Sequence, residues 1–231
     1  WSKEDVIKEI KKLKKRKKYG IVWDEEKTKE KFDKDSEDKL PILKEVKSKE
    51  IQTDENSPTN ILIEGDNYHS LAVLKYTHQN SIDLIYIDPP YNTGSRSWKY
   101  NNNFVEKDDP FRHSKWISFM IKRIRLAKNL LTKHGIFLCS IDDYEHQNLR
   151  HILDLVFGEE NRLGTITIIH NPGGRQDDEF IATAHEYLLV YARDSKHAKI
   201  KHLDVTDKKL KEYNLEDEFG KYKLRDFRRS G

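Results

Sequence analysis

A run of apolar residues that ends in two prolines constrains the fold of this chain more than any other feature. Residues 84–87 read Leu-Ile-Tyr-Ile, and they lie between the polar Asp83 and the pair Pro89-Pro90. Four apolar residues between such boundaries predict a short strand that is buried on both faces. Neither proline can donate a backbone hydrogen bond, so the strand must end there. We therefore expect a rigid corner at the end of a buried strand.

Strand and helix patterns alternate on both sides of this corner. Strands are expected at residues 61–63, 84–87, 136–141, 165–169 and 186–191. Helices are expected after Asp66 and over residues 114–133 and 144–157. This alternation predicts a doubly wound, Rossmann-like α/β sheet that is mostly parallel with an antiparallel strand. In such sheets ligands bind at the carboxyl ends of the strands, where the corner would lie.

Charge is concentrated at the start of the chain. Charged residues make up 36% of the sequence, but the net charge is only +3, so any contact with nucleic acid must be local. Residues 1–18 predict a basic helix, and residues 24–39 an exposed or partly disordered connector. We expect residues 1–56 to form a charged helical segment and residues 57–200 the main domain. No apolar stretch approaches the roughly 18 residues of a membrane span, which favours a cytoplasmic protein without membrane contact.

The residues at the corner carry a resemblance to a known family. Asp88-Pro89-Pro90-Tyr91 resembles the catalytic motif of amino-group DNA methyltransferases, and the Asp form is typical of adenine enzymes. The stretches at residues 62–67 and 92–94 look like the modification subunit of type III restriction-modification systems. The resemblance runs from about residue 19 to the last residue. It implies transfer of a methyl group from S-adenosylmethionine to the N6 amine of adenine in double-stranded DNA.

The resemblance also assigns roles to the corner. The Asp88 carboxylate and the Pro89 carbonyl would accept the two N–H bonds of the amine, and Pro90 would stiffen the turn. Tyr91 would stack on a base that is swung out of the duplex. Asp66, Asn67 and Asp88 are the candidate contacts to S-adenosylmethionine. Asp66 could equally cap the helix that follows it.

The glycine-rich turn that holds the methionine end of the cofactor in this family is absent from the sequence. We therefore expect the catalytic half of a methyltransferase sheet, truncated or incomplete, with residues 201–231 beginning a target-recognition region. A homodimer and a nuclease or helicase restriction subunit are implied by the resemblance alone. The alternatives are a cytosine-N4 enzyme, or a non-catalytic module that binds DNA or takes part in assembly.

Candidate DNA contacts lie in two expected loops. Residues 92–112 form a long polar stretch with aromatic residues between, typical of a lid or a strip along DNA, or of disorder. The candidates are Asn92, Arg96 and Tyr100 in this stretch and Arg175 in a later glycine-containing loop. For Arg175 the alternative is that the loop is a plain glycine turn.

Three further expectations concern polar residues and the single cysteine. Asp142 and Glu145 have the spacing of a capping box and predict the start of a helix. Cys139 is expected to be a small buried apolar residue. No spacing of His and Cys predicts a metal site.

Overall fold

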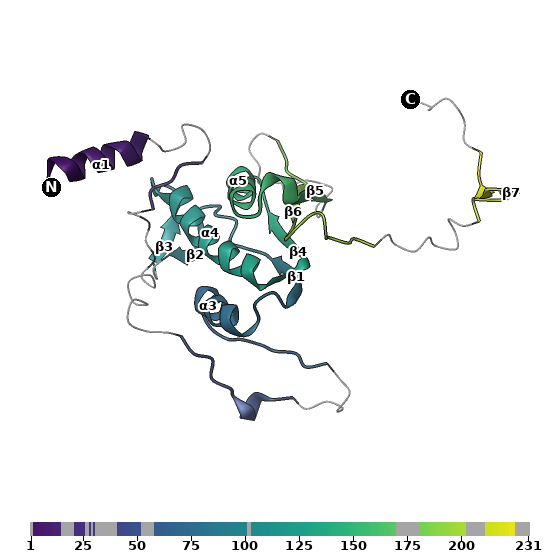
Figure 1. Cartoon of the computed structure of the whole chain (residues 1–231), viewed down its shortest axis with the longest axis horizontal. Helices are drawn as coiled ribbons and strands as arrows, with labels where there is room; N and C mark the ends of the chain where they lie inside the picture. Colours follow the sequence, from purple (N-terminus) through teal and green to yellow (C-terminus); the bar gives the residue numbers. More distant parts are fainter. Residues whose placement is uncertain are drawn as a thin grey trace. The chain divides into compact units, whose positions relative to one another are not determined.

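The computed structural model describes residues 2–14, 21–25, 28, 30, 41–51, 58–100, 103–169, 181–201 and 211–224. The chain divides into two compact units, residues 1–198 and 199–231. The first unit contains the α/β fold (Figure 1). The second contains an antiparallel hairpin of β7 (Leu215–Asp217) and β8 (Gly220–Tyr222).

A four-stranded sheet forms the centre of the first unit. Its strands are β1 (Ile82–Ile87), β4 (Leu131–Ile141), β6 (His185–Ala192) and β5 (Arg162–Ile169), in that spatial order. β1 is parallel to β4, whereas β6 is antiparallel to both of its neighbours. Strands β1, β4 and β5 thus run in one direction and β6 in the other. The prediction of a mostly parallel sheet with an antiparallel strand is confirmed.

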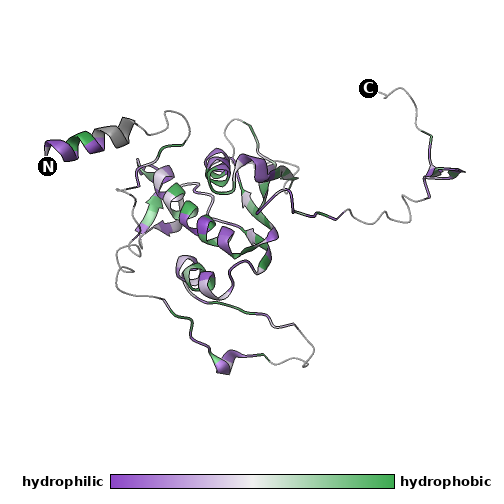
Figure 2. Ribbon diagram, in the orientation of Figure 1, coloured by the Kyte–Doolittle hydropathy of each residue, from purple (hydrophilic) through white to green (hydrophobic). Residues whose placement is uncertain are grey.

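Two amphipathic helices cover one face of this sheet. α4 (Arg112–Leu130) and α5 (His146–Phe157) turn their apolar sides to it, and Figure 2 shows hydrophilic and hydrophobic stretches alternating along α4. Their buried side chains include Trp116, Met120, Ile124, Leu149, Ile152 and Leu153, which pack with Phe137, Leu189 and Tyr191 of the sheet. Cys139 lies in the same core, and burial raises the pKa of its thiol. Cys139 is therefore an apolar core residue, as expected.

The opposite face of the sheet is exposed. Leu84 and Tyr86 on β1 keep 57% and 59% of their surface accessible, and Ile166 on β5 keeps 52%. Ile85 and Ile87 alternate with them and pack against the core, because successive side chains of a strand point to opposite faces. The expectation that β1 is buried on both faces is therefore wrong for the part of the chain that the structure describes.

The strand expected at residues 61–63 does not form. Ile61 and Leu62 are 68% and 96% exposed, and this segment joins no ladder in the structure. An apolar run becomes a strand only where a partner strand supplies hydrogen bonds. The segment leads into α3 (Asn67–Thr77), which packs beside α4.

The start of the chain contains a short capped helix. α1 (Lys3–Lys14) begins after Ser2, whose hydroxyl accepts the Asp5 amide at 3.1 Å while the Asp5 carboxylate accepts the Ser2 amide. This reciprocal pair satisfies two backbone donors at the helix start. Residues 15–18 of the expected basic helix lie outside the described residues. The described residues also contain two single turns of 3-10 helix, η1 (Lys47–Lys49) and η2 (Glu159–Asn161).

The long loop expected after the corner is largely a β-hairpin. β2 (Ser95–Tyr100) pairs in antiparallel fashion with β3 (Asn103–Glu106). Trp98 and Tyr100 are two residues apart and so share a face of β2, and both are buried together with Val105 of β3. Packing of these three side chains on the core orders a stretch whose polar composition suggested a lid or disorder.

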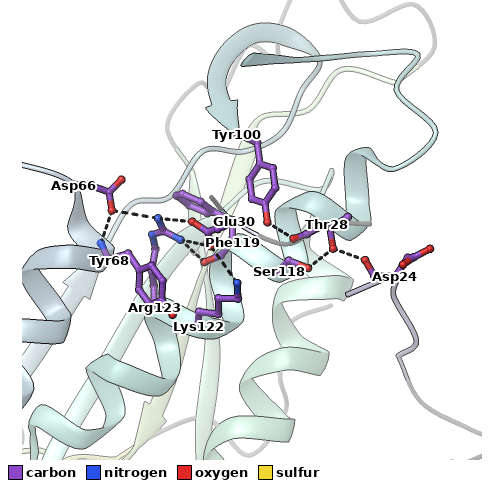
Figure 3. A network of polar contacts seen from close by, with 10 residues as sticks. All are labelled: Asp24, Thr28, Glu30, Asp66, Tyr68, Tyr100, Ser118, Phe119, Lys122 and Arg123. Carbon is purple, nitrogen blue, oxygen red and sulfur yellow. Dashed lines mark hydrogen bonds and ion pairs between the residues drawn. The ribbon is translucent and has the colours of Figure 1, made fainter. Parts of the chain in front are cut away.

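Two described residues of the expected connector, Thr28 and Glu30, are buried, against the expectation of an exposed segment. Figure 3 shows Glu30 beside Arg123 of α4. The two guanidinium nitrogens lie 3.0 and 3.1 Å from the Glu30 carboxylate oxygens, and Arg123 is only 8% exposed. The Thr28 hydroxyl lies 2.6 Å from the Ser118 hydroxyl, and the Tyr100 phenol donates to the Thr28 carbonyl. Buried charges and hydroxyls require partners, and here α4 and β2 supply them.

The sequence also predicted that the chain has no membrane span and that a domain boundary lies between residues 56 and 57. Among the residues that the structure describes, no helix has both the length and the hydrophobicity that crossing a lipid bilayer requires. The domain boundary at residues 56 and 57 stays a prediction.

Helix α5 offers a matched test of the covered face. Ile152 is completely buried, whereas Leu155 on the same helix is 51% exposed. Ile152→Ala should lower the free energy of unfolding by about 2–5 kcal/mol, because it removes buried methyl groups and leaves a cavity. Leu155→Ala should cost less than about 1 kcal/mol. Urea denaturation measures both, and equal losses would contradict this packing.

Candidate active site

The four-residue corner Asp88-Pro89-Pro90-Tyr91 lies at the surface, directly after the carboxyl end of β1. Asp88 is exposed, and the other three residues are partly buried. The neighbouring strand β4 fixes the acid, because the Ser140 hydroxyl donates to the Asp88 carboxylate at 2.6 Å. The carboxylate is thus held in one orientation while it still faces solvent.

The two proline carbonyls have different surroundings. The buried indole of Trp116 on α4 donates to the Pro90 carbonyl at 2.6 Å. Among the residues that the structure describes, none donates a hydrogen bond to the Pro89 carbonyl. The Trp116 bond therefore fixes the turn to α4, and the Pro89 carbonyl keeps its capacity to accept a hydrogen bond from a ligand.

Tyr91 is anchored to the antiparallel strand. Its phenol donates to the Glu186 carboxylate of β6 at 3.0 Å, and its ring packs against the core. Burial raises the pKa of Tyr91, and the nearby Glu186 and Asp88 carboxylates raise it further, against an opposing hydrogen bond from Ser140. The phenol therefore stays protonated and remains a donor. Sequence reasoning missed Glu186, although it is the only acidic residue in the apolar strand His185–Ala192.

Asn92 is an internal support rather than a DNA contact, so the sequence expectation is wrong. It has a left-handed backbone with φ of 58°, and it is fully buried. Its amide donates to the Glu145 carboxylate, and it accepts from the Trp98 indole at 3.0 Å. Glu145 also accepts from His113 at 2.6 Å. Asn92 thus joins the corner to the β2–β3 hairpin and to the start of α5.

Of the other three candidate DNA contacts, one is buried in the structure and two are not described by it. Tyr100 is only 5% exposed and its phenol is bound to the Thr28 carbonyl, so it cannot stack on a base. The side chain of Arg96 and the whole of Arg175 lie outside the described residues, and their roles stay predictions.

The candidate cofactor residues lie at the start of α3. Asp66 caps this helix, since its carboxylate accepts the Tyr68 amide at 2.7 Å, and it also lies 3.4 Å from Arg123. Its side chain is nevertheless 54% exposed, which leaves it accessible to a ligand hydroxyl. Asn67 is the first residue of the helix and is exposed. Capping and ligand binding at Asp66 are compatible.

Asp142 and Glu145 do not form the expected capping box. The Asp142 carboxylate accepts the Tyr144 amide at 3.0 Å, in a turn before the helix. The Glu145 side chain makes no capping bond and instead accepts from Asn92 and His113, and α5 begins at His146 rather than at Tyr144. The spacing of the two acids is right for a box, but buried donors from other elements compete successfully for Glu145.

Comparison with known proteins places the chain in a family. The sequence model of a DNA methylase family matches residues 82–228, from the first residue of β1 onward. The chain is 38% identical over 170 residues to the type II methyltransferase M.KpnI of Klebsiella pneumoniae, which covers 73% of this chain and 40% of that protein. This chain belongs to the DNA methylase family.

Type III enzymes are also among the relatives. The chain is 30% identical over 208 residues to the Mod subunit of the type III restriction-modification enzyme EcoPI of Escherichia phage P1, covering 80% of this chain and 32% of that subunit. The chain spans less than half the length of these two relatives. A solved structure of the PvuII DNA methyltransferase, described as cytosine-N4-specific, superimposes with a TM-score of 0.40 and 15% identity over 55% of this chain and 47% of that one.

Two asparagines with left-handed backbones test the supporting role of Asn92. Asn92 is buried, whereas Asn80, with φ of 53°, is exposed. Asn92→Ala should lower the free energy of unfolding by about 2–4 kcal/mol, because it strains the backbone, removes one donor to Glu145 and leaves the buried Trp98 indole without its acceptor. Asn80→Ala should cost only about 1 kcal/mol, the backbone term alone. Chemical denaturation gives both values, and equal losses would show that the buried contacts contribute nothing.

Proposed function

We propose that this chain provides the catalytic part of a site-specific DNA methyltransferase that methylates the N6 amine of adenine within a restriction-modification system. The family supports methyl transfer in DNA, and the Mod-subunit relatives favour adenine. The single observation that carries the proposal is the corner itself. The exposed Asp88 carboxylate and the Pro89 carbonyl, which accepts no hydrogen bond from the described part of the chain, are consecutive on a turn that α4 and β4 hold in place.

These two acceptors address the central difficulty of the reaction. The lone pair of an adenine amine is delocalised into the ring, so the amine is a poor nucleophile. Acceptance of its two N–H bonds by the Asp88 carboxylate and the Pro89 carbonyl favours a pyramidal nitrogen whose lone pair can attack. With S-adenosylmethionine bound, the nitrogen would take the methyl group as the sulfur–methyl bond breaks, and the surplus amine proton would pass to Asp88 or to water. Catalysis is then mainly positioning and preorganised polarity.

The target base must leave the duplex to reach this corner. Tyr91 offers its ring for stacking, and its bond to Glu186 restricts the orientation of that ring. Fixing an aromatic ring in advance lowers the entropy that is lost when the base binds. Glu186 is therefore a positioning residue, and it acts through Tyr91.

S-adenosylmethionine would supply the methyl group as a sulfonium. The residues present fit part of it: the exposed side of the Asp66 carboxylate suits ribose hydroxyls, and Asn67 adds an amide beside it. Asp88 is the third candidate contact. From the resemblance of the sequence to type III modification subunits, we extend the proposal to double-stranded DNA as substrate, a homodimer and a restriction subunit as partner.

Substitution at the corner tests the catalytic assignment in the full-length protein. Asp88→Ala and Tyr91→Ala should each lower methyl incorporation into DNA by at least about a thousandfold, because they remove an acceptor or the stacking ring. The melting temperature of Asp88→Ala should stay close to that of the unaltered protein because Asp88 is exposed, and that of Tyr91→Ala should fall without loss of the folded state because its ring is partly buried against the core. Incorporation is measured with radiolabelled S-adenosylmethionine. Full activity in either variant would refute the assignment.

The identity of the methylated base decides between the two amine substrates. Nucleoside mass spectrometry of the modified DNA should show N6-methyladenine. Detection of N4-methylcytosine instead would show that the same chemistry acts on cytosine, and it would contradict the adenine assignment. No methylated nucleoside with the intact protein and its cofactor would favour a non-catalytic module.

Ser140 provides a finer test, because it acts on Asp88 rather than on the substrate. Hydrogen bonds to charged groups contribute about 1.5–3 kcal/mol, so Ser140→Ala should lower kcat roughly 10–100-fold through misorientation of the carboxylate. KM for DNA should change little. The exposed Ser81→Ala is the matched control and should leave both constants unchanged. A rise in KM at constant kcat would assign Ser140 to DNA binding instead.

A further inference from the structure

A polar cavity lies at the edge of the sheet opposite the corner. It has a volume of about 690 Å³ and is lined by Asn80, Lys128, Lys133, Glu160, Asn161, Arg193, Asp194, Ser195 and Lys196. These residues come from the turn before β1, the end of α4, the first residues of β4, η2, and the loop after β6. Asp88 follows the other end of β1. This amino-edge cavity is therefore separate from the candidate active site.

The cavity has more cations than anions. Lys128, Lys133, Arg193 and Lys196 carry four positive charges, against two negative charges on Glu160 and Asp194, which leaves a net charge of +2. Within the part of the chain that the structure describes, the side chains of Lys133, Arg193 and Lys196 make no hydrogen bond or ion pair. Lys133, Arg193 and Lys196 thus line the cavity with charged groups that the described residues do not pair.

The two acidic residues interact electrostatically with two of these cations, Asp194 with Lys133 and Glu160 with Lys128, but not with Arg193. The Asp194 carboxylate accepts from the Lys196 amide at 3.1 Å and from the His197 ring at 2.8 Å. The Glu160 carboxylate lies against Gly158, so close that a Cβ on that glycine would clash with it. Neither acid neutralises the guanidinium of Arg193 by direct contact.

Lys128 shows that the cations repel one another. Its ammonium group donates to the Val156 carbonyl at 2.7 Å and lies 5.5 Å from the centre of the Phe157 ring. Burial lowers the pKa of Lys128, and the positive charge of Arg193 lowers it further, against a smaller opposing effect of the Glu160 carboxylate. An anion bound between these two side chains would reverse the second effect.

The wall of the cavity is preformed. The Asn161 amide donates to the Phe157 carbonyl at 2.8 Å and accepts the Ser195 amide at 2.8 Å, which ties the loop after β6 to the end of α5. The Asp194 carbonyl accepts the amides of His197 and Ala198, each at 3.0 Å. A fixed wall lowers the entropy that is lost when a ligand binds.

We propose that the amino-edge cavity is a phosphate-binding site, separate from methyl transfer, that takes either a phosphate of DNA or a free polyphosphate such as that of a nucleotide. Arg193 offers the planar fork that matches phosphate oxygens, and the lysines add point charges around it. The volume lies within the range of about 300–1,000 Å³ that is usual for small-ligand sites.

Calorimetry with tripolyphosphate tests the shared chemistry in the full chain. The double variant Lys133→Gln/Arg193→Gln should raise Kd at least tenfold, because it removes two of the four positive charges and the guanidinium fork. Lys75→Gln/Arg125→Gln is the control, with the same change in net charge at two exposed residues outside the cavity. The exposed Lys196→Gln alone should weaken binding several-fold and cannot act by unfolding the protein.

Titration with a duplex DNA distinguishes the two sources of phosphate. If the double variant weakens DNA binding and flattens its dependence on salt while the control does not, the ligand is the DNA backbone. If DNA binding is unchanged but tripolyphosphate binding is lost, the ligand is a free polyphosphate.

Two outcomes would overturn the proposal. The first is no tripolyphosphate binding by the unaltered protein at millimolar concentration together with unchanged DNA binding in the double variant. The second is equal weakening in the double variant and the control, which would indicate general charge attraction rather than a site. Neither outcome would affect the assignment of Asp88.

Discussion

Three hydrogen bonds from three elements hold the turn after β1, and the proposed chemistry depends on them. Trp116 of α4 binds the Pro90 carbonyl, Ser140 of β4 binds the Asp88 carboxylate, and Glu186 of β6 accepts from Tyr91. The prolines remove backbone freedom, but they do not orient the acid or the ring. The neighbouring elements do so, while no residue that the structure describes donates to the Pro89 carbonyl.

The corner and the sheet around it were predictable because their signals are local. Pro89 and Pro90 end the strand, and the apolar runs around Phe137 and Leu189 form buried strands of one mixed sheet. Pattern also identified the helix that buries Trp116. Each of these features needs only a few consecutive residues to specify it.

The sequence predictions failed where residues that are distant in the sequence determine whether a side chain is buried. Thr28, Glu30, Asn92 and Tyr100 are polar or amphipathic and looked exposed, yet each is buried with a partner on another element. Leu62 looked like part of a strand, but it has no neighbouring strand in the described part of the chain and is exposed. A polar residue gives no local sign of whether water or a buried partner will satisfy it. For Tyr100 a period-two pattern with Trp98 was present and would have indicated the hairpin.

The most direct measurement is a structure of the full-length protein with its target DNA and a non-transferable analogue of S-adenosylmethionine. The account predicts an extruded adenine whose N6 lies about 2.7–3.2 Å from both the Asp88 carboxylate and the Pro89 carbonyl, with its ring over Tyr91. A base bound elsewhere, or an amine held by other acceptors while Asp88 faces solvent, would contradict it.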